Sequence, residues 1–146
     1  MALSATDADD RIQQLLTLTA RLTDLLAAET RAFEARRPQD AAVSSEETQR
    51  LANIYRHEAA RIRSDPGLIS PARLDSRQQL VTATRSFEAV LSRHGRALAA
   101  AKFVTEGLVQ AIASEVAQTR NGPPGYGPGA RAAQADGTSI TLNRRA

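Results

Sequence analysis

The sequence predicts an all-α protein: an antiparallel three-helix bundle or coiled coil with one very long C-terminal helix and a disordered tail. Hydrophobic residues make up 42% of the 146 residues but aromatic residues only 3%, which favours long alanine-rich helices over a thick core. Leucines near the N-terminus recur at helical spacing, and no proline interrupts residues 72–120. We therefore expect one helical domain over residues 1–120 and a flexible tail over residues 121–146.

The first helix is expected from about residue 6 to residue 36. Its leucines repeat at 3-4-3 spacing, which places them on one face and predicts contact with another helix. This stripe consists of Leu15, Leu18, Leu22 and Leu25. The aspartates at positions 7, 9 and 10 suit the positive end of the helix dipole, and Pro38 is expected to end the helix.

The second helix is expected over residues 44–63. Ser44 and Glu47 have the spacing of a capping box, in which the serine is the N-cap and the glutamate the third helical residue. Glu58 and Arg61 are spaced to form an ion pair on one helix face. The sequence Asp65-Pro66-Gly67 ends the helix, and so short a connector places the next helix antiparallel or steeply crossed.

The third helix is expected over residues 70–120, with Ser70 as its cap and Pro71 in its first position. The part of this helix from Leu74 to Leu98 is expected to pack against the upstream helices. Beyond Gly107 we expect apolar residues that remain available to a partner. The main apolar stripe is Leu74, Val81, Leu91, Leu98, Ile112 and Val116, widened by Phe87, Val90, Val104 and Leu108, whereas Leu80, Phe103 and Val109 lie off it.

The tail, residues 121–146, is rich in glycine, proline and small polar residues. Such a segment buries too little apolar surface to offset the entropy cost of ordering, so we expect disorder in isolation. Tyr126 is its one aromatic residue, and Ile140 and Leu142 alternate with polar residues near its end. These features are compatible with a binding tail and equally with an inert one.

Charge and composition exclude several classes of function. The net charge is +3, and residues 120–146 carry four arginines (Arg120, Arg131, Arg144 and Arg145) against one aspartate (Asp136), so the charge of residues 1–119 is neutral. No helix has the dense basic face of a nucleic-acid binder, so we expect no nucleic-acid partner. Cysteine is absent, no run of 18 apolar residues spans a membrane, and the N-terminus does not resemble a secretory signal. We expect a cytoplasmic protein without membrane insertion.

The sequence offers no set of catalytic residues. His57-Glu58 begins like a zinc-protease motif, but Arg61 occupies the position of the second histidine ligand. The glycine-rich stretch 122–129 lacks the Gly-Lys-Ser/Thr of a phosphate-binding loop. His57 and His94 are therefore expected to be surface or packing residues. We expect no enzymatic activity, no cofactor and no metal.

The order of the three expected helices and the tail, together with short sequences in each, indicates a family resemblance. The relevant segments are Leu25-Leu26-Ala27-Ala28-Glu29-Thr30-Arg31, Leu51-Ala52-Asn53-Ile54-Tyr55, Arg85-Ser86-Phe87-Glu88-Ala89-Val90-Leu91, Leu108-Val109-Gln110-Ala111-Ile112-Ala113, and a tail that opens Gly125-Tyr126-Gly127-Pro128-Gly129 and closes Ser139-Ile140-Thr141-Leu142-Asn143-Arg144-Arg145-Ala146. Over nearly its whole length the chain resembles the FlgN family of flagellar export chaperones. The tail motif after the long helix is the most specific part of this resemblance.

The resemblance implies a cytoplasmic chaperone that binds hook–filament junction proteins, prevents their premature assembly and delivers them to the flagellar type III export apparatus. It implies a monomer or weak homodimer. The implied partner-binding residues are Val104, Leu108, Ile112, Val116, Tyr126, Ile140 and Leu142. Two alternatives stay open: a flagellar assembly or regulatory adaptor of the same helical fold, and a self-associating structural coiled coil.

Overall fold

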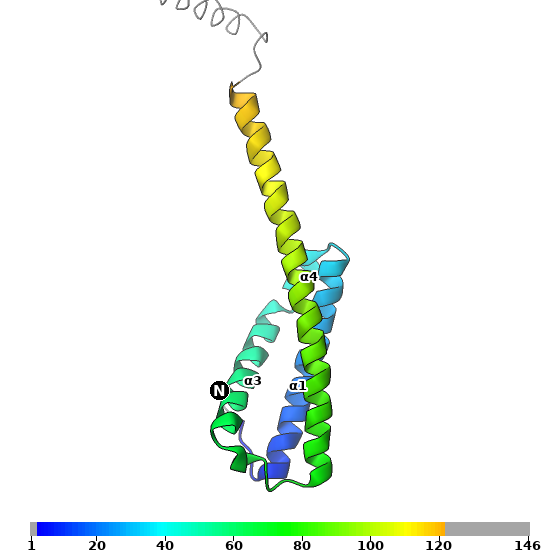
Figure 1. The fold of residues 1–146 in the computed structure, drawn as a ribbon, viewed down its shortest axis with the longest axis vertical. Helices are drawn as coiled ribbons and strands as arrows, with labels where there is room; N and C mark the ends of the chain where they lie inside the picture. The colour runs from blue at the N-terminus through cyan, green and yellow to red at the C-terminus, as the bar shows by residue number, and fades with distance from the viewer. Residues whose placement is uncertain (1–2, 122–146) are drawn as a thin grey trace, which may run out of the picture. The chain divides into compact units, whose positions relative to one another are not determined.

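The computed structural model describes residues 3–121, and all the regular structure in this range is helical. The prediction of an all-α chain is thus confirmed. The elements are α1 (Ala8–Glu34), α2 (Pro38–Ala42), α3 (Ser45–Ser64), the 3-10 helix η1 (Pro66–Leu68) and α4 (Leu74–Asn121). Figure 1 shows α1, α3 and the first part of α4 lying side by side.

α1 begins and ends with well-defined caps. The Asp7 carboxylate accepts a hydrogen bond from the backbone N–H of Asp10, at 2.8 Å. At the other end Arg36 has a φ of 60°, and the N–H of Arg37 bonds to the carbonyl of Ala32 at 2.8 Å, as in a Schellman motif. The prediction that Pro38 ends the helix is wrong, because this turn ends α1 at Glu34 and Pro38 opens α2.

The predicted start of the second helix is right in position, but the predicted capping hydrogen bonds are absent. Ser44 is the N-cap residue of α3, but its side chain makes no capping hydrogen bond. Its hydroxyl instead donates to Glu29 on α1, at 3.1 Å, and Glu47 binds Arg21 through two hydrogen bonds of 2.8 Å. The capping box is absent because both of its side chains find partners across the interface with α1.

The predicted start of the third helix is also wrong. Ser70 and Pro71 belong to a turn in which the N–H of Ala72 bonds to the carbonyl of Ile69 at 3.0 Å. α4 begins after this turn, at Leu74. Proline at the first helical position is a preference, and here the connection from α3 uses the residue for the turn instead.

α3 runs antiparallel to α1, and ion pairs mark both ends of this interface. Near the start of α3, Glu47 binds Arg21 on the middle of α1. Near the end of α3, Glu58 binds Arg11 in the first turns of α1 at 2.9 Å.

α4 runs parallel to α1, which makes consecutive long helices antiparallel. At the lower end in Figure 1, the N–H of Arg73, just before α4, donates to Asp9 at 3.1 Å. At the end of α1, Arg93 binds the Glu34 carboxylate through two hydrogen bonds of 2.8 and 2.6 Å. The pairing of α1 with α4 therefore ends where α1 ends.

The core lies where these three helices meet. Leu22 and Leu26 of α1 pack on Phe87 of α4, and the rings of Phe87 and Tyr55 are 4.7 Å apart. Leu51, Ala52 and Val90 cover this cluster. The leucine stripe predicted for the first helix is buried throughout, as expected.

The face of α4 that packs in the bundle differs from the predicted one. Leu74, Val81, Leu91 and Leu98 were expected to hold the upstream helices, but each is between 44% and 62% exposed. The residues that are buried or half-buried repeat at the same 3-4 spacing on a different face, and they include several small or polar side chains. They are Ser76, Leu80, Ala83, Phe87, Val90, His94 and Ala97, and Thr84 beside Ala83 is also half-buried.

A buried carboxylate ties the N-terminal segment and α1 to α3. The Glu58 side chain has no exposed surface, and it accepts hydrogen bonds from the N–H of Leu3 (2.9 Å), from Arg11 (2.9 Å) and from Arg61 (3.0 Å). The bond from Arg61 confirms the predicted pair on the helix face. Burial raises the pKa of the Glu58 carboxyl, but these donors and the two arginine charges outweigh it, so the pKa lies below its ordinary value.

Replacing Glu58 tests this anchor. Glu58→Gln leaves the Arg11 guanidinium buried without its counter-ion, and we expect the free energy of unfolding to fall by about 3–5 kcal/mol. Glu47→Gln breaks the ion pair between Glu47 and Arg21, which solvent screens, and should lower the free energy of unfolding much less. Urea unfolding of both variants measures the difference, and equal losses would contradict a special role for the buried pair.

The lowered pKa of Glu58 also predicts a pH dependence. A carboxyl with a folded pKa below its unfolded value of about 4.3 stabilises the fold above that pH, and this contribution is lost as the pH falls through the folded pKa. Between about pH 6 and pH 3, the unfolding free energy of Glu58→Gln should therefore fall less steeply than that of the unchanged protein. Parallel curves would show that other carboxylates cause the acid sensitivity.

Candidate functional site

The chain divides into two compact units inside α4. The first unit ends at Lys102, and the second begins at Phe103. In the second unit the structure describes residues 103–121, all of them helical and all exposed.

Five large apolar side chains share one face of this segment, and we call them the distal stripe. They are Val104, Leu108, Val109, Ile112 and Val116. Each is between 52% and 61% exposed. Residues three, four and seven apart lie along one face of an α-helix, so these side chains form a continuous apolar surface. A contiguous exposed apolar surface of this kind is typical of an interaction site.

The distal stripe continues the spacing of the packing face described above. Beyond Ala97, further steps of four and three residues along the sequence reach Ala101, Val104 and Leu108. In the first unit this helix face packs on α1 and α3, and α1 ends at the Glu34–Arg93 pair. The same spacing therefore extends along the sequence as far as Leu108, whereas its next steps reach Ala111 and Glu115 instead of Ile112 and Val116.

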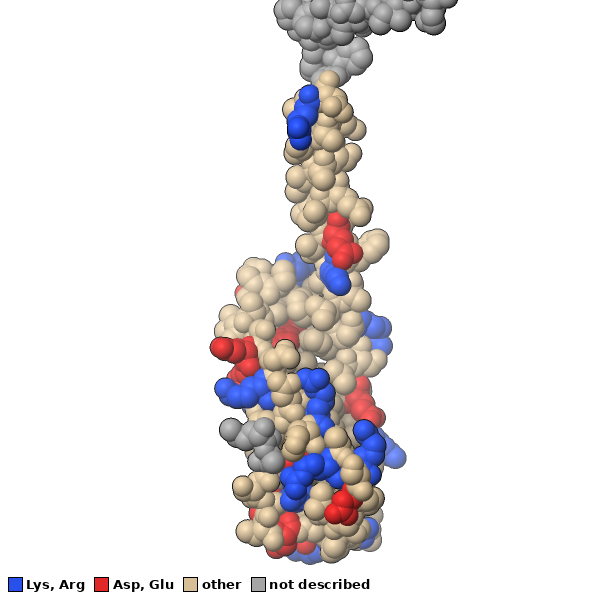
Figure 2. Space-filling view, turned by 90° about the vertical axis from the view of Figure 1, so that its left-hand side faces the viewer, with Lys and Arg blue, Asp and Glu red and all other residues tan. Residues whose placement is uncertain are grey.

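Charged residues are sparse around the distal stripe. Between residues 103 and 121 the sequence has two carboxylates, Glu106 and Glu115, and one cation, Arg120. Figure 2 shows this segment with few charged side chains, whereas both signs are mixed over residues 3–102. The surface thus offers apolar contact with little electrostatic attraction for a nucleic acid or an anionic membrane.

The structure brings together four of the seven predicted partner-binding residues: Val104, Leu108, Ile112 and Val116 are all exposed on the distal stripe. The other three, Tyr126, Ile140 and Leu142, lie outside the described residues. The sequence analysis placed Val109 off the stripe, although it precedes Val116 by one heptad and is 60% exposed. That seven-residue spacing was the available signal.

The two histidines have the packing and surface roles expected for them. His94 lies against Phe33 and forms a 3.0 Å contact with Glu29, which also accepts a 2.6 Å hydrogen bond from Thr48. The side chain of His57 is 53% exposed. Over residues 3–121, no three side chains of the metal-binding types are grouped to hold an ion. None of the described helices has a stretch apolar and long enough to traverse a lipid bilayer.

Comparison with known proteins gives one full-length relative. The chain is 54% identical over 149 aligned residues to the flagellar basal-body protein FlbY of Caulobacter vibrioides, and the alignment covers 100% of both chains. No protein-family model matches the sequence. No solved structure matches it either.

The distal stripe should bind a hydrophobic dye. Replacing Leu108 and Ile112 by glutamine removes the centre of the stripe, so we expect the fluorescence of the dye 8-anilinonaphthalene-1-sulfonate to fall by about half or more. The control Leu74→Gln with Val81→Gln changes two similarly exposed apolar residues of α4 in the first unit, outside the distal stripe. An equal loss of fluorescence in both variants would contradict the assignment of the stripe.

Proposed function

Because the chain belongs to the family of the flagellar basal-body protein FlbY, we propose that it acts in assembly of the bacterial flagellum. More specifically, we propose a cytoplasmic export chaperone, built as an antiparallel three-helix bundle with one very long C-terminal helix. Its cargo is a hook–filament junction protein, which it keeps unassembled and brings to the type III export apparatus. It does so as a monomer or weak homodimer, without a nucleic-acid partner and without membrane insertion.

The observation that supports this proposal is the exposed distal stripe. A chaperone of assembly must cover an apolar surface on its cargo that later packs against the next subunit. The stripe suits an amphipathic cargo helix with its own apolar residues at three- and four-residue spacing. Tyr126, Ile140 and Leu142 in the tail are proposed to add contacts beside that helix.

The energetics fit a carrier that must release its cargo. Full burial of each valine, leucine or isoleucine of the stripe contributes about 1.5–3 kcal/mol. Association costs roughly 4–15 kcal/mol in translational and rotational freedom, and further free energy is needed to order side chains and tail. Five apolar side chains therefore support moderate affinity. Catalysis and a cofactor have no part in this proposal.

A second candidate function is favoured by the name of the relative. FlbY is described as a basal-body protein, which suits a component or adaptor that stays with the basal body. The distal stripe would then bind a structural subunit permanently. Fractionation separates the two proposals, because a chaperone remains in the soluble fraction with its cargo, whereas a component sediments with purified basal bodies.

The binding experiment uses purified hook–filament junction proteins and the full-length chain. We expect a binary complex, and Leu108→Ala with Ile112→Ala should weaken it by about tenfold or more, since each truncation removes buried apolar surface worth more than 1 kcal/mol. Removal of residues 121–146 should weaken it separately. Leu74→Ala with Val81→Ala is the matched control and should leave the dissociation constant unchanged.

Two outcomes would contradict parts of this proposal. A complex of unchanged affinity after both the double substitution and the tail truncation would disprove the binding site. Failure of every junction protein to bind would disprove the chaperone function and favour the basal-body component.

A further inference from the structure

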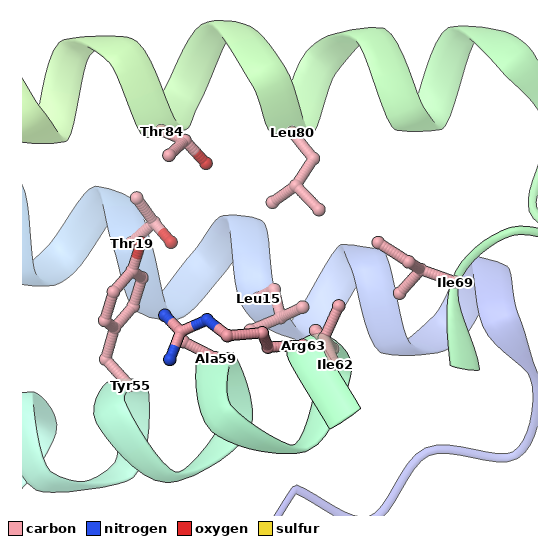
Figure 3. Close-up of a pocket in the computed structure, with 9 residues that line it drawn as sticks. All are labelled: Leu15, Thr19, Tyr55, Ala59, Ile62, Arg63, Ile69, Leu80 and Thr84. Carbon is pink, nitrogen blue, oxygen red and sulfur yellow. The ribbon is translucent and has the colours of Figure 1, made fainter. Parts of the chain in front are cut away.

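The outer surface of α3 carries arginines that no carboxylate of residues 3–121 pairs with. Arg50, Arg56 and Arg63 are exposed, and none of them lies within ion-pair distance of a carboxylate in that range. Arg56 donates instead to the neutral side-chain amide of Asn53. Figure 3 shows the Arg63 side chain extending along α3 toward Tyr55. These three guanidinium groups therefore present uncompensated positive charge to solvent.

The carboxylate nearest to these arginines in the sequence of α3 is withdrawn from the surface. Between residues 48 and 64 the sequence has one acidic residue, Glu58. Its side chain is fully buried, and Arg11 and Arg61 bind it at 2.9 and 3.0 Å. The charge of Glu58 is thus neutralised inside the bundle and does not offset the charge of the outer surface.

The exposed cations of α3 form two rows, which we together call the basic face. Residues seven apart lie at nearly the same place around a helix, so Arg56 and Arg63 form one row and Arg50 and His57 form the other. Figure 2 looks onto the side of the first unit on which α3 lies, and Lys and Arg side chains gather near the middle of that side. The exposed residues between the two rows are Gln49, Asn53, Ala60 and Ser64.

Carboxylates bound the basic face at both ends. Glu46 and Glu47 precede it, and Asp65 follows it. From Arg50 to Arg63 the face is about 20 Å long, at about 1.5 Å per residue. Because charges are screened beyond about 8 Å at physiological salt, an anion that fits within the face interacts mainly with its cations. A longer polyanion also meets the carboxylates at the ends, so the face favours a short acidic ligand.

The composition of the basic face favours a protein over a nucleic acid or a membrane. Binding sites for single-stranded nucleic acid add aromatic rings on which bases stack, and the exposed residues of this face include no Phe, Tyr or Trp. Helices that bind a membrane surface insert bulky apolar side chains, whereas the residues between the rows are polar or small. Residues 1–119 carry no net charge, so a long polyanion is not attracted from a distance.

The chain itself does not supply a suitable acidic segment. Residues 122–146 carry three arginines against one aspartate, so the basic face repels them. The densest run of carboxylates among residues 3–121 is at positions 7–10. All three of these aspartates already accept hydrogen bonds within the first unit. A second copy of the chain therefore has no free acidic run to offer, and the ligand belongs to another protein.

We propose that the basic face of α3 binds a short acidic helix of a partner protein, whose carboxylates pair with Arg56 and Arg63 on one side and with Arg50 on the other. Arginine binds a carboxylate through two parallel hydrogen bonds, which favours carboxylates over neutral groups. A partner helix with glutamates three, four and seven residues apart matches the two rows. The basic face lies wholly within the first unit, so this proposal is independent of the distal stripe and of the proposed chaperone function.

The test uses the full-length protein and two synthetic peptides, followed by calorimetry or by amide NMR shifts. The first is an alanine-rich peptide of about 18 residues, long enough to be helical alone, with glutamates at three- and four-residue spacing on one face. The second has glutamine in place of each glutamate. We expect saturable binding of the first in the millimolar range or below and about tenfold weaker binding of the second. Raising the salt from about 50 to about 200 mM should weaken binding of the glutamate peptide alone.

Two double variants assign this binding to residues. Arg56→Gln with Arg63→Gln should weaken binding of the glutamate peptide about fivefold or more, because one row of the basic face is lost. Arg85→Gln with Arg96→Gln removes the same charge from exposed residues of α4 and should leave the affinity unchanged.

Further controls separate the alternatives. The distal variant Leu108→Gln with Ile112→Gln should bind the glutamate peptide as the unchanged protein does, whether or not the chaperone proposal holds. Absence of saturable binding, or equal losses in the two arginine variants, would overturn the proposal. Tighter binding of a single-stranded DNA of equal charge, or of vesicles containing phosphatidylglycerol, would also overturn it in favour of a nucleic acid or a membrane.

Discussion

The length of α1 is the constraint on which the rest of the structure depends. α1 has 27 residues, about 40 Å, whereas α4 has 48 residues, about 72 Å. The Schellman turn around Arg36 ends α1, and it places a non-glycine residue in the left-handed region at a cost of about 1–2 kcal/mol. The Glu34–Arg93 pair therefore marks the last turn of α1 that α4 contacts.

That constraint links the fold to the proposed function. In the first unit the apolar face of α4 is stabilised by Leu22, Leu26 and Tyr55, and the buried Glu58 ties α1 to α3. Beyond residue 102 apolar residues again recur on one helix face, at Val104, Leu108, Ile112 and Val116, and all four are exposed. An exposed apolar surface promotes aggregation, and under the proposed function a partner helix covers it.

The sequence predicted the helical class and the buried leucine stripe of α1, because their signal is local spacing. It misplaced the bundle-facing side of α4, because Leu74 and Val81 are more apolar than Ser76 and Ala83, which in fact face the other helices. That choice depends on where α1 and α3 lie. The predicted capping box of Ser44 and Glu47 was wrong for the same reason, since Glu47 binds Arg21 on another helix. The exposure of Leu108, Ile112 and Val116 agrees with the expectation for the part of the helix beyond Gly107.

Amide hydrogen exchange along α4 tests the central claim most directly, because it reports which parts of one helix are stabilised by packing. In the free protein, residues 76–97 should exchange slowly and residues 104–116 quickly. When a hook–filament junction protein binds, protection should appear at residues 104–116 and change little at residues 76–97. Equal protection along the whole helix of the free protein, or a complex that leaves residues 104–116 unprotected, would contradict the account.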